Sequence, residues 1–348
     1  MEWFGNKNKK KDFCFVLRSL IRTSDLRSKV LPFGKNKRKI CFPFVISSLK
    51  SNFETLSRRY FRSAIKTKKR IFVLYCAHLF VPLPIKTINR EMKEKLTLVK
   101  VGGAVVEDEA QLKQLLKDFS AIEGRKVLVH GGGRRATQVA ARLGIESKMV
   151  GGRRITDAEM LEVVTMVYGG LVNKHVVASL QAEGIQAVGL TGADGDVIRS
   201  HRRPIKDGVD YGFVGDVDVV SHQALSNLIE QGMVPILAPL THDGQGNMLN
   251  TNADTIASEA AKALAKVYDV TLIFSFEKKG VLSDPDDDES VIPVITRSDF
   301  ERYKADGTIS GGMLPKIENA LSAVDAGVSR VIITLATAID GSHGTVIR

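Results

Sequence analysis

The sequence predicts an α/β fold with a largely parallel sheet and helices on both of its faces. Three observations indicate this class. After residue 91, short runs rich in Val, Ile and Leu alternate with amphipathic segments of helical length. Such alternation is typical of strands joined by helical crossovers, which makes neighbouring strands parallel. Glycine clusters follow the first two strand-like runs, and 28 of the 30 glycines lie in this part of the chain.

Each element follows from its local pattern. Apolar runs closed by glycine or polar residues predict strands, and apolar residues at helical spacing predict helices. Strands are expected at Leu96–Val101, Lys126–His130, Gln186–Leu190, Val234–Ala238, Thr271–Phe276 and Val331–Leu335. Helices are expected at Asp108–Ile122, Gly131–Leu143, Asp157–Ala182, Ser221–Gln231, Ala253–Lys266, Arg297–Lys304 and Leu314–Ala326. Residues 191–220 are rich in Gly and Asp with short alternating runs, which predicts a hairpin.

The first 91 residues differ in composition from the rest of the 348-residue chain. They hold 22 Lys and Arg against five acidic residues, a balance of +17, whereas residues 92–348 carry −6. All three cysteines and ten of the fifteen phenylalanines also lie there.

Three cysteines make no disulfide framework, and no Cys/His pair has the spacing of a zinc site. We therefore expect no protein-held metal.

Several interpretations of residues 1–91 compete. They are expected to be a disordered basic extension, or upstream sequence read as protein if translation begins at Met92. An organelle transit peptide is an alternative, although such leaders are usually richer in Ser. The apolar run at residues 71–85 is too short for a membrane span and contains two prolines. The basic clusters also suit nucleic acid or anionic lipid.

Two glycine motifs follow predicted strands. Lys100 ends the first strand before Gly102 and Gly103, where backbone N–H groups could approach an anion beside a positive charge. Gly131, Gly132 and Gly133 open a helix, and a helix N-terminus attracts anions. Each motif alone also fits a tight turn or a turn that packs a helix closely. Neither matches a P-loop or a Rossmann fingerprint.

Three further motifs lie later in the chain. In Gly-Gly-Arg-Arg-Ile-Thr (151–156), an arginine could grip a carboxylate and Thr156 is the expected helix N-cap. Asn250-Thr-Asn-Ala-Asp254 opens a helix, where Asn or Asp usually caps. Lys316 follows Ser310-Gly-Gly-Met-Leu-Pro and could reach a phosphate. Several anion cradles with two lysines suit phosphoryl transfer, in which positioning and charge stabilisation dominate.

With these motifs in order, residues 92–348 resemble the amino acid kinase family, and within it the N-acetylglutamate kinases. The ordered set is Lys-x-Gly-Gly, His-Gly-Gly-Gly, Gly-x-Arg-x-Thr, Asn-x-Asn-Ala-Asp and Gly-Gly-Met-x-x-Lys. The resemblance implies an open three-layer αβα sandwich with two lobes, acylglutamate in residues 92–240 and ATP in residues 241–348. It implies phosphorylation of the γ-carboxylate of N-acetyl-L-glutamate, or of its N-succinyl analogue, in arginine biosynthesis.

The resemblance also implies the role of each site residue. Lys100 and Lys316 would stabilise the transferring phosphoryl group, Asp254 would orient them, and the N–H groups of Gly103, Gly132 and Gly133 would cradle the phosphate. Arg154 and Asn250 would hold the substrate α-carboxylate. Nucleotide contacts would come from a second set: Glu277, Lys278, Lys279, Gly280, Val281, Leu282, Thr308, Ile309 and Ser310. The cofactor would be ATP with Mg²⁺ held mainly by the nucleotide.

One segment departs from the family pattern. Phe276-Glu-Lys-Lys-Gly280 stands where many relatives have an Asp-Val-x-Gly-type sequence, so the adenosine contacts are left open. The alternatives are another amino acid kinase, acting on aspartate, glutamate, carbamate or UMP, or a basic-tailed binding protein with a vestigial kinase fold. The family implies a cytoplasmic homodimer that binds neither nucleic acid nor membrane.

Overall fold

The structure is a computed structural model that describes residues 93–311 and 313–348. The competing interpretations of residues 1–91 therefore lie outside the described residues.

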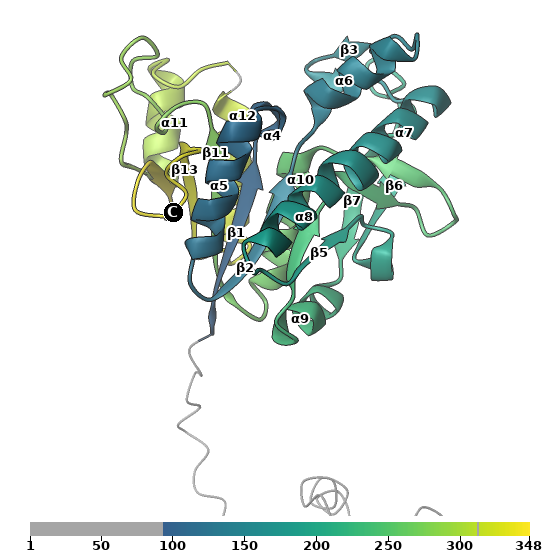
Figure 1. Cartoon of the computed structure of the whole chain (residues 1–348). Helices are drawn as coiled ribbons and strands as arrows, with labels where there is room; N and C mark the ends of the chain where they lie inside the picture. The colour runs from purple at the N-terminus through teal and green to yellow at the C-terminus, as the bar shows by residue number, and fades with distance from the viewer. Residues whose placement is uncertain (1–92, 312) are drawn as a thin grey trace, which may run out of the picture. The chain divides into compact units, whose positions relative to one another are not determined.

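An eight-stranded sheet forms the centre of the described part of the chain (Figure 1). Its order is β12-β14-β13-β11-β1-β2-β8-β5, and the six strands from β13 to β5 are all parallel. β14 runs antiparallel to β13, with β12 beside it. The strands are β1 Lys95–Val101, β2 Arg125–His130, β5 Ala187–Leu190, β8 Val234–Leu237, β11 Asp269–Phe276, β12 Val294–Ile295, β13 Arg330–Leu335 and β14 Thr345–Ile347.

Helices cover both faces of this sheet. They are α4 Gly103–Glu107, α5 Glu109–Ala121, α6 Gly133–Arg142, α7 Ala158–Val164, α8 Asn173–Ala182, α9 His222–Glu230, α10 Ala253–Leu264, α11 Arg297–Ala305 and α12 Met313–Asp325. Alternate residues of β1 explain the layering, because successive side chains of a strand point to opposite faces. Val99 and Val101 pack with α5 and α8, whereas Leu96 and Leu98 share a core with α9, α10 and α12. The predicted αβα sandwich is confirmed.

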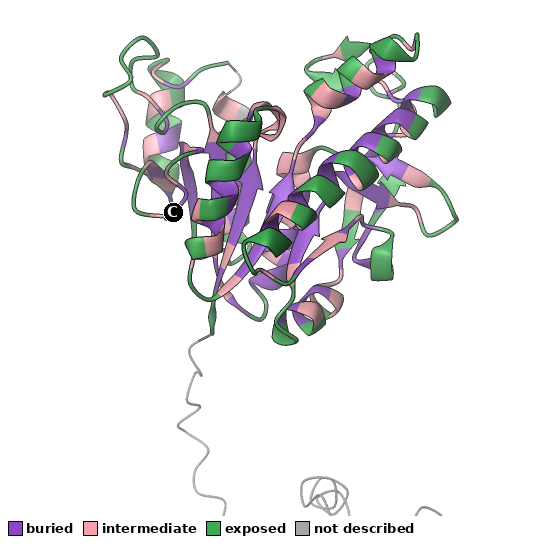
Figure 2. Cartoon of the chain, in the orientation of Figure 1, coloured by how far each residue is buried: buried purple, intermediate pink, exposed green. Residues whose placement is uncertain are grey.

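Burial follows the same layers. The central strands are almost wholly buried, and the helices expose one side to solvent (Figure 2). β1 lies between two parallel neighbours, so its buried side chains point to both faces of the sheet, and all but one of them are apolar. Lys100 near its end is the exception and is itself buried. A buried lysine at the end of a central strand marks the edge of the sheet where chemistry is to be sought.

A smaller sheet extends the fold beside the main one. Its order is β10-β9-β6-β7, built from β6 Ile198–Arg202, β7 Gly215–Val220, β9 Leu240–His242 and β10 Met248–Asn250. β6 and β7 pair antiparallel, which is the hairpin predicted for residues 191–220. A short hairpin of β3 Met149–Val150 and β4 Arg153–Arg154 lies apart. The predicted division into two lobes at residue 240 stays a prediction.

The long helix predicted at Asp157–Ala182 is continuous but not regular. Asp157 caps it by accepting a hydrogen bond from Met160 N at 2.9 Å. Between α7 and α8, residues Thr165–Val172 form a π-helical segment, η3. Outside this long helix, the described residues also contain a single 3₁₀ turn, η4 Asp194–Asp196. By length and composition Ala158–Ala182 would suffice to cross a membrane, but 44% of its most apolar window is buried within the fold, where α8 packs against β5.

Candidate active site

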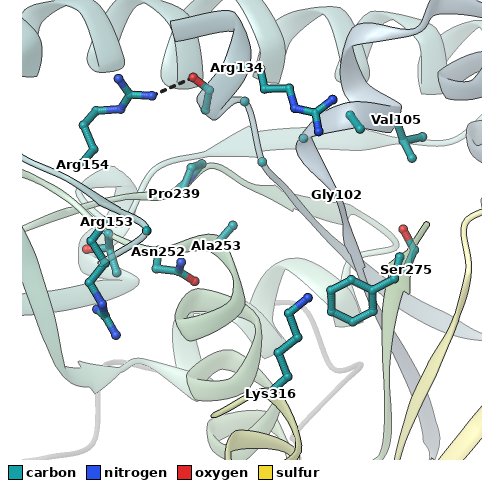
Figure 3. Close-up of a pocket in the computed structure, with 18 of the residues that line it drawn as sticks. Gly102, Val105, Arg134, Arg153, Arg154, Pro239, Asn252, Ala253, Ser275 and Lys316 are labelled. Atoms are coloured by element: carbon teal, nitrogen blue, oxygen red, sulfur yellow. Dashed lines mark hydrogen bonds between the residues drawn. The ribbon is translucent and has the colours of Figure 1, made fainter. Parts of the chain in front are cut away.

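A cavity of about 600 Å³ opens at the carboxyl ends of the central strands. In parallel sheets ligands bind at this edge, because loops and helix N-termini meet there. Its walls come from the segments after β1 and β2, the β3–β4 hairpin, the β10–α10 junction, the end of β11 and the start of α12 (Figure 3). These segments include all five sequence motifs. The strand order thus brings together residues more than 200 positions apart.

Lys100 and Asp254 form an ion pair behind the cavity wall, and neither residue lines the cavity itself. Lys100 Nζ lies 2.7 Å from Asp254 Oδ1, and both side chains are mostly shielded from water. Asp254 stands in the first turn of α10, where a carboxylate is favoured by the helix dipole. Asn252 is the cap of that helix, accepting from the N–H groups of Asp254 and Thr255 at 2.7 and 3.2 Å. The Asp254 carboxylate is therefore free to pair with a lysine.

Lys316 approaches the same place from α12. Its Nζ lies 3.8 Å from the centroid of the Phe276 ring, and Lys100 Nζ lies 5.7 Å from that centroid. Burial lowers the pKa of Lys316; the negative charge of Asp254 opposes that effect and the positive charge of Lys100 adds to it. Two ammonium groups thus lie near one aromatic ring and one carboxylate, and of the two only Lys316 lines the cavity.

The two glycine motifs face each other across a narrow gap. A methyl group placed on Gly103 would lie 3.6 Å from Gly132 N and 3.8 Å from Gly133 N. A methyl group on Gly131 would lie only 3.1 Å from Gly103 N. The gap between the loops is open because these residues lack side chains. Backbone N–H groups at the start of α4 and α6 border it, an arrangement suited to phosphate oxygens.

Arg154 is buried and already engaged. Its Nη2 donates to Gly133 O at 2.8 Å (Figure 3). The same nitrogen donates to Thr137 Oγ1 at 2.8 Å, and Nη1 donates to Ser147 Oγ at 2.7 Å. Arg154 lines the cavity, but its two terminal guanidinium nitrogens already donate hydrogen bonds to protein atoms. The bond to Gly133 O holds the glycine loop in place. A carboxylate grip stays a prediction.

Asn250 also lines the cavity and has a structural partner. Its Nδ2 donates to Thr156 Oγ1 at 2.9 Å, and both residues are buried. The expectation that Thr156 caps the following helix is wrong. Asp157 is the cap, and Thr156 instead joins β10 to the β4 end of the short hairpin, because its hydroxyl is turned towards Asn250.

The residues predicted to bind nucleotide separate into two groups. Glu277, Lys278 and Gly280 line the cavity. The others do not: Lys279, Val281, Leu282, Thr308, Ile309 and Ser310. Lys278 and Lys279 pair with Asp288 and Glu289 of the acidic loop, the first at 2.6 Å. Val281 and Ile309 are buried in the core, so only their backbone could meet a ligand. All nine stay predictions as nucleotide contacts.

Sequence reasoning missed several residues of the cavity wall. Arg134, Tyr168, Arg203 and Ser275 line it, as do Arg153 and Met313, which the sequence motifs contain without an assigned role. Arg134 pairs with Glu277 at 3.6 Å, which joins the start of α6 to the end of β11. The doubled arginines at 134–135 and 202–203 carried no distinguishing signal, because most arginines are solvated. Tyr168 lies in a helix whose regular period predicted only packing.

His130, which precedes the glycine loop, is not a base of this site. It is fully buried and lies outside the cavity wall. Asn173 Nδ2 lies 3.1 Å from its Nε2, and its Nδ1 lies 2.8 Å from Gly131 O. Burial lowers the pKa of His130 to about 4. The imidazole is therefore neutral near pH 7, accepting from Asn173 and donating to Gly131.

The groups around the cavity suit the phosphates of a nucleotide. The described residues contain no group of three His, Cys, Asp or Glu side chains able to hold a metal ion. One buried oxygen near the lysines, Ser275 Oγ, has no hydrogen-bond partner among the described residues. Such an oxygen can meet a ligand or its water. Together with two lysines and a glycine cradle, it fits the phosphates of a nucleotide.

The fold and the site define a phosphotransferase of the α/β class, and the chain belongs to the amino acid kinase family. The profile of that family matches residues 95–335. Curated relatives named acetylglutamate kinase are similar over their full length. The chain is 69% identical to that of Phocaeicola vulgatus over 257 residues and 67% identical to that of Bacteroides fragilis over 261, covering 74% and 75% of this chain.

Solved structures agree with the fold. A Streptococcus mutans protein of 30% identity superposes with a TM-score of 0.58, covering 72% of this chain and 98% of its own. The N-acetylglutamate synthase of Neisseria gonorrhoeae, at 22% identity, gives a TM-score of 0.62 over 74% of this chain and 60% of its own. At that identity the second likeness concerns the fold alone.

Proposed function

We propose that this enzyme transfers the γ-phosphoryl group of ATP to the γ-carboxylate of N-acetyl-L-glutamate, a step of arginine biosynthesis. One observation carries the proposal: a glycine cradle and Lys316 line the same cavity, and the Lys100–Asp254 ion pair lies next to Lys316 at the Phe276 ring. The high identity to relatives named acetylglutamate kinase supports the choice of acceptor.

The chemistry needs little from the protein beyond position and charge. The acceptor carboxylate is ionised at neutral pH, so no general base is required. This agrees with a site in which the nearest imidazole, His130, is buried away from the cavity. As the phosphoryl group moves between oxygens, negative charge spreads over its equatorial oxygens. Lys100 and Lys316 would stabilise that charge while the N–H groups of Gly103, Gly132 and Gly133 orient it.

The nucleotide would bring Mg²⁺, which neutralises phosphate charge when bound. Lys316, Ser275 and the end of β11 would meet the triphosphate, and Glu277, Lys278 and Gly280 lie where the rest of the nucleotide would pass. Asp254 would keep Lys100 directed at the transferred group through the ion pair. Arg154 and Asn250 would meet the acylglutamate end of the cavity.

A second acceptor, N-succinyl-L-glutamate, is favoured by one observation. Besides Arg154, the cavity wall contains Arg153 and Arg203, and Arg153 is exposed. A succinyl group ends in a carboxylate that an arginine could bind, whereas an acetyl group gives such arginines nothing to pair with. Arg203 is already paired with Asp216, so Arg153 is the better candidate.

The test is ADP release by the full chain with MgATP and a parallel panel of acceptors. The panel is N-acetylglutamate, N-succinylglutamate, glutamate, aspartate and carbamate. Turnover on an acylated glutamate alone supports the proposal, and the faster of the two names the acyl group. Turnover on a free amino acid or carbamate would assign another member of the family. No turnover from folded protein would favour the binding-protein alternative, which a salt-dependent gel shift with nucleic acid would support.

We also propose that the enzyme is a cytoplasmic homodimer. Met166 and Leu171, on one turn of the long helix, are each about half exposed. Exposed apolar side chains on one helix are typical of an interface, and a second copy of the chain is the proposed occupant. Light scattering should give twice the monomer mass, and Leu171→Lys should give the monomer mass. A monomeric wild type at micromolar concentration would refute the dimer.

A further inference from the structure

Tyr168 lies in the irregular part of the long helix, at the wall of the cavity. It belongs to the π-helical segment Thr165–Val172 and is 5% exposed. π-Helical turns are rare, and they occur frequently at functional sites because the added residue redirects a side chain. The aromatic ring lines the cavity although the helix that carries it otherwise packs into the core.

The ring is fixed against the glycine loop. A methyl group on Gly132, whose φ of +155° few residues other than glycine adopt, would lie 3.0 Å from Tyr168 Cδ1. This close approach sets the position of the ring. A methyl group on Gly133 would touch both Arg154 Nη2, at 3.9 Å, and Tyr168 Oη, at 4.0 Å. The hydroxyl and the guanidinium therefore border the same side of Gly133.

The hydroxyl has a proton to donate and no acceptor in the described part of the chain. The Arg154 guanidinium next to Tyr168 Oη can donate to that oxygen but cannot accept from it, and no described residue accepts a hydrogen bond from the hydroxyl. Burial raises the pKa of Tyr168, so the phenol stays protonated at neutral pH. A buried tyrosine hydroxyl usually finds a partner. Here the free space beside it is the cavity.

We propose that the Tyr168 hydroxyl binds the substrate, donating a hydrogen bond to the α-carboxylate of acylglutamate beside Arg154. This inference rests on the proposed acceptor. It also completes the site, because Arg154 has most of its N–H groups engaged with Gly133, Thr137 and Ser147. A carboxylate placed there needs a further donor, and the Tyr168 hydroxyl is the one at hand.

The test compares wild type with Tyr168→Phe, which keeps the ring against Gly132 and removes only the hydroxyl. Calorimetry measures the Kd for N-acetyl-L-glutamate, and ADP release measures kcat and KM. Loss of a hydrogen bond to a carboxylate should raise both Kd and KM about tenfold or more, with kcat nearly unchanged. Thermal unfolding should be unaltered, because the packing against the loop remains.

A second ligand separates binding from structure. N-Acetylglutamate α-amide is neutral at the group that Tyr168 is proposed to bind, and hydrogen bonds to neutral acceptors are weaker. The effect of Tyr168→Phe should therefore shrink for the amide, which a general structural defect would not cause. An equal loss for acid and amide, or an unchanged Kd, would overturn the inference.

The readouts also distinguish this inference from the proposed function. If the wild type transfers phosphoryl groups and Tyr168→Phe binds acylglutamate equally well, the inference is wrong and the proposed function stands. If Tyr168→Phe weakens acylglutamate binding but the wild type transfers no phosphoryl group, the inference stands and the proposed function is wrong. Wild-type protein that binds no acylglutamate would overturn both. Tyr168→Leu serves as a packing control, and it should lower the unfolding temperature as well as the affinity.

Discussion

Lys100 Nζ lies 2.7 Å from Asp254 Oδ1, and this pair joins the end of a central strand to the first turn of α10. The carboxylate at the start of the helix places a negative charge beside the shielded ammonium group, where the helix dipole favours it. The Phe276 ring, 5.7 Å from the same ammonium group, lies also against Lys316. The geometry of the ion pair is the basis of the first prediction.

Replacing either lysine should lower turnover far more than binding. Lys100→Ala and Lys316→Ala remove charge that acts on the transferring group, so kcat should fall by about 10²–10³. KM for ATP should change only modestly, because glycine N–H groups still meet the phosphates. Steady-state kinetics measure both constants. Lys113→Ala, an exposed lysine of α5, is the control and should match wild type.

The pH dependence of turnover should report Lys316. Because the pKa of Lys316 is lowered from 10.5, mainly by burial, its charge is lost at a lower pH than that of a free lysine. Activity should therefore fall on the alkaline side below pH 10.5. Asp254→Asn removes a charge that raises this pKa, so the fall should move to lower pH. An alkaline limb that stays in place in Asp254→Asn would contradict the assignment.

Arg154→Ala should affect both substrate and loop. The variant loses the bonds to Gly133 O and Thr137, so the glycine loop loses a brace. We expect KM for acylglutamate to rise about tenfold or more, together with a lower unfolding temperature. Arg154→Lys should recover little, because an ammonium group cannot reproduce a planar fork. A rise in KM without any loss of stability would mean that the bonds to the loop add little.

His130 should make stability depend on pH. Its folded pKa of about 4 lies below the 6.5 of the free side chain, so the unfolded state binds more protons between these values. The contribution of His130 is therefore complete above pH 6.5 and is lost as the pH falls towards 4, about 3 kcal/mol in all. Chemical unfolding at pH 7.5 and pH 5 measures it. His130→Gln should show a smaller difference between the two pH values than wild type does.

Much of the fold was predictable because its signals are local. Buried strands such as Leu96–Val101 are continuous apolar runs, and helix starts carry caps, so the six parallel strands and their helices follow. Parallel strands end at one edge, which explains why Lys100 and Gly132, at the ends of β1 and β2, could be expected close together. The two- and three-residue strands β12 and β14 could not, because pairing rather than composition makes them strands.

The unpredicted parts of the site depend on tertiary contacts. The period of residues 157–182 predicts one regular helix, and nothing in it indicates that η3 departs from that period. Phe276 reads as a core residue at the end of a strand, yet its ring lies under Lys316 Nζ. From the sequence, the Arg154 guanidinium is expected to be available for a ligand. Its hydrogen bonds to Gly133, Thr137 and Ser147 depend on how the loops pack and could not be predicted.

The irregular turn at Thr165–Val172 also sets the angular phase between the two halves of its helix. Each α-helical residue advances about 100° around the axis, so one additional residue per turn offsets α7 from α8 by a comparable rotation. Removing a single residue such as Gly170 would restore a regular helix and rotate one half away from its partners. The length of this helix is therefore constrained as well as its composition. A substitution changes one side chain. A one-residue deletion would rotate the core-facing side of α8 and the cavity-facing side of the turn together.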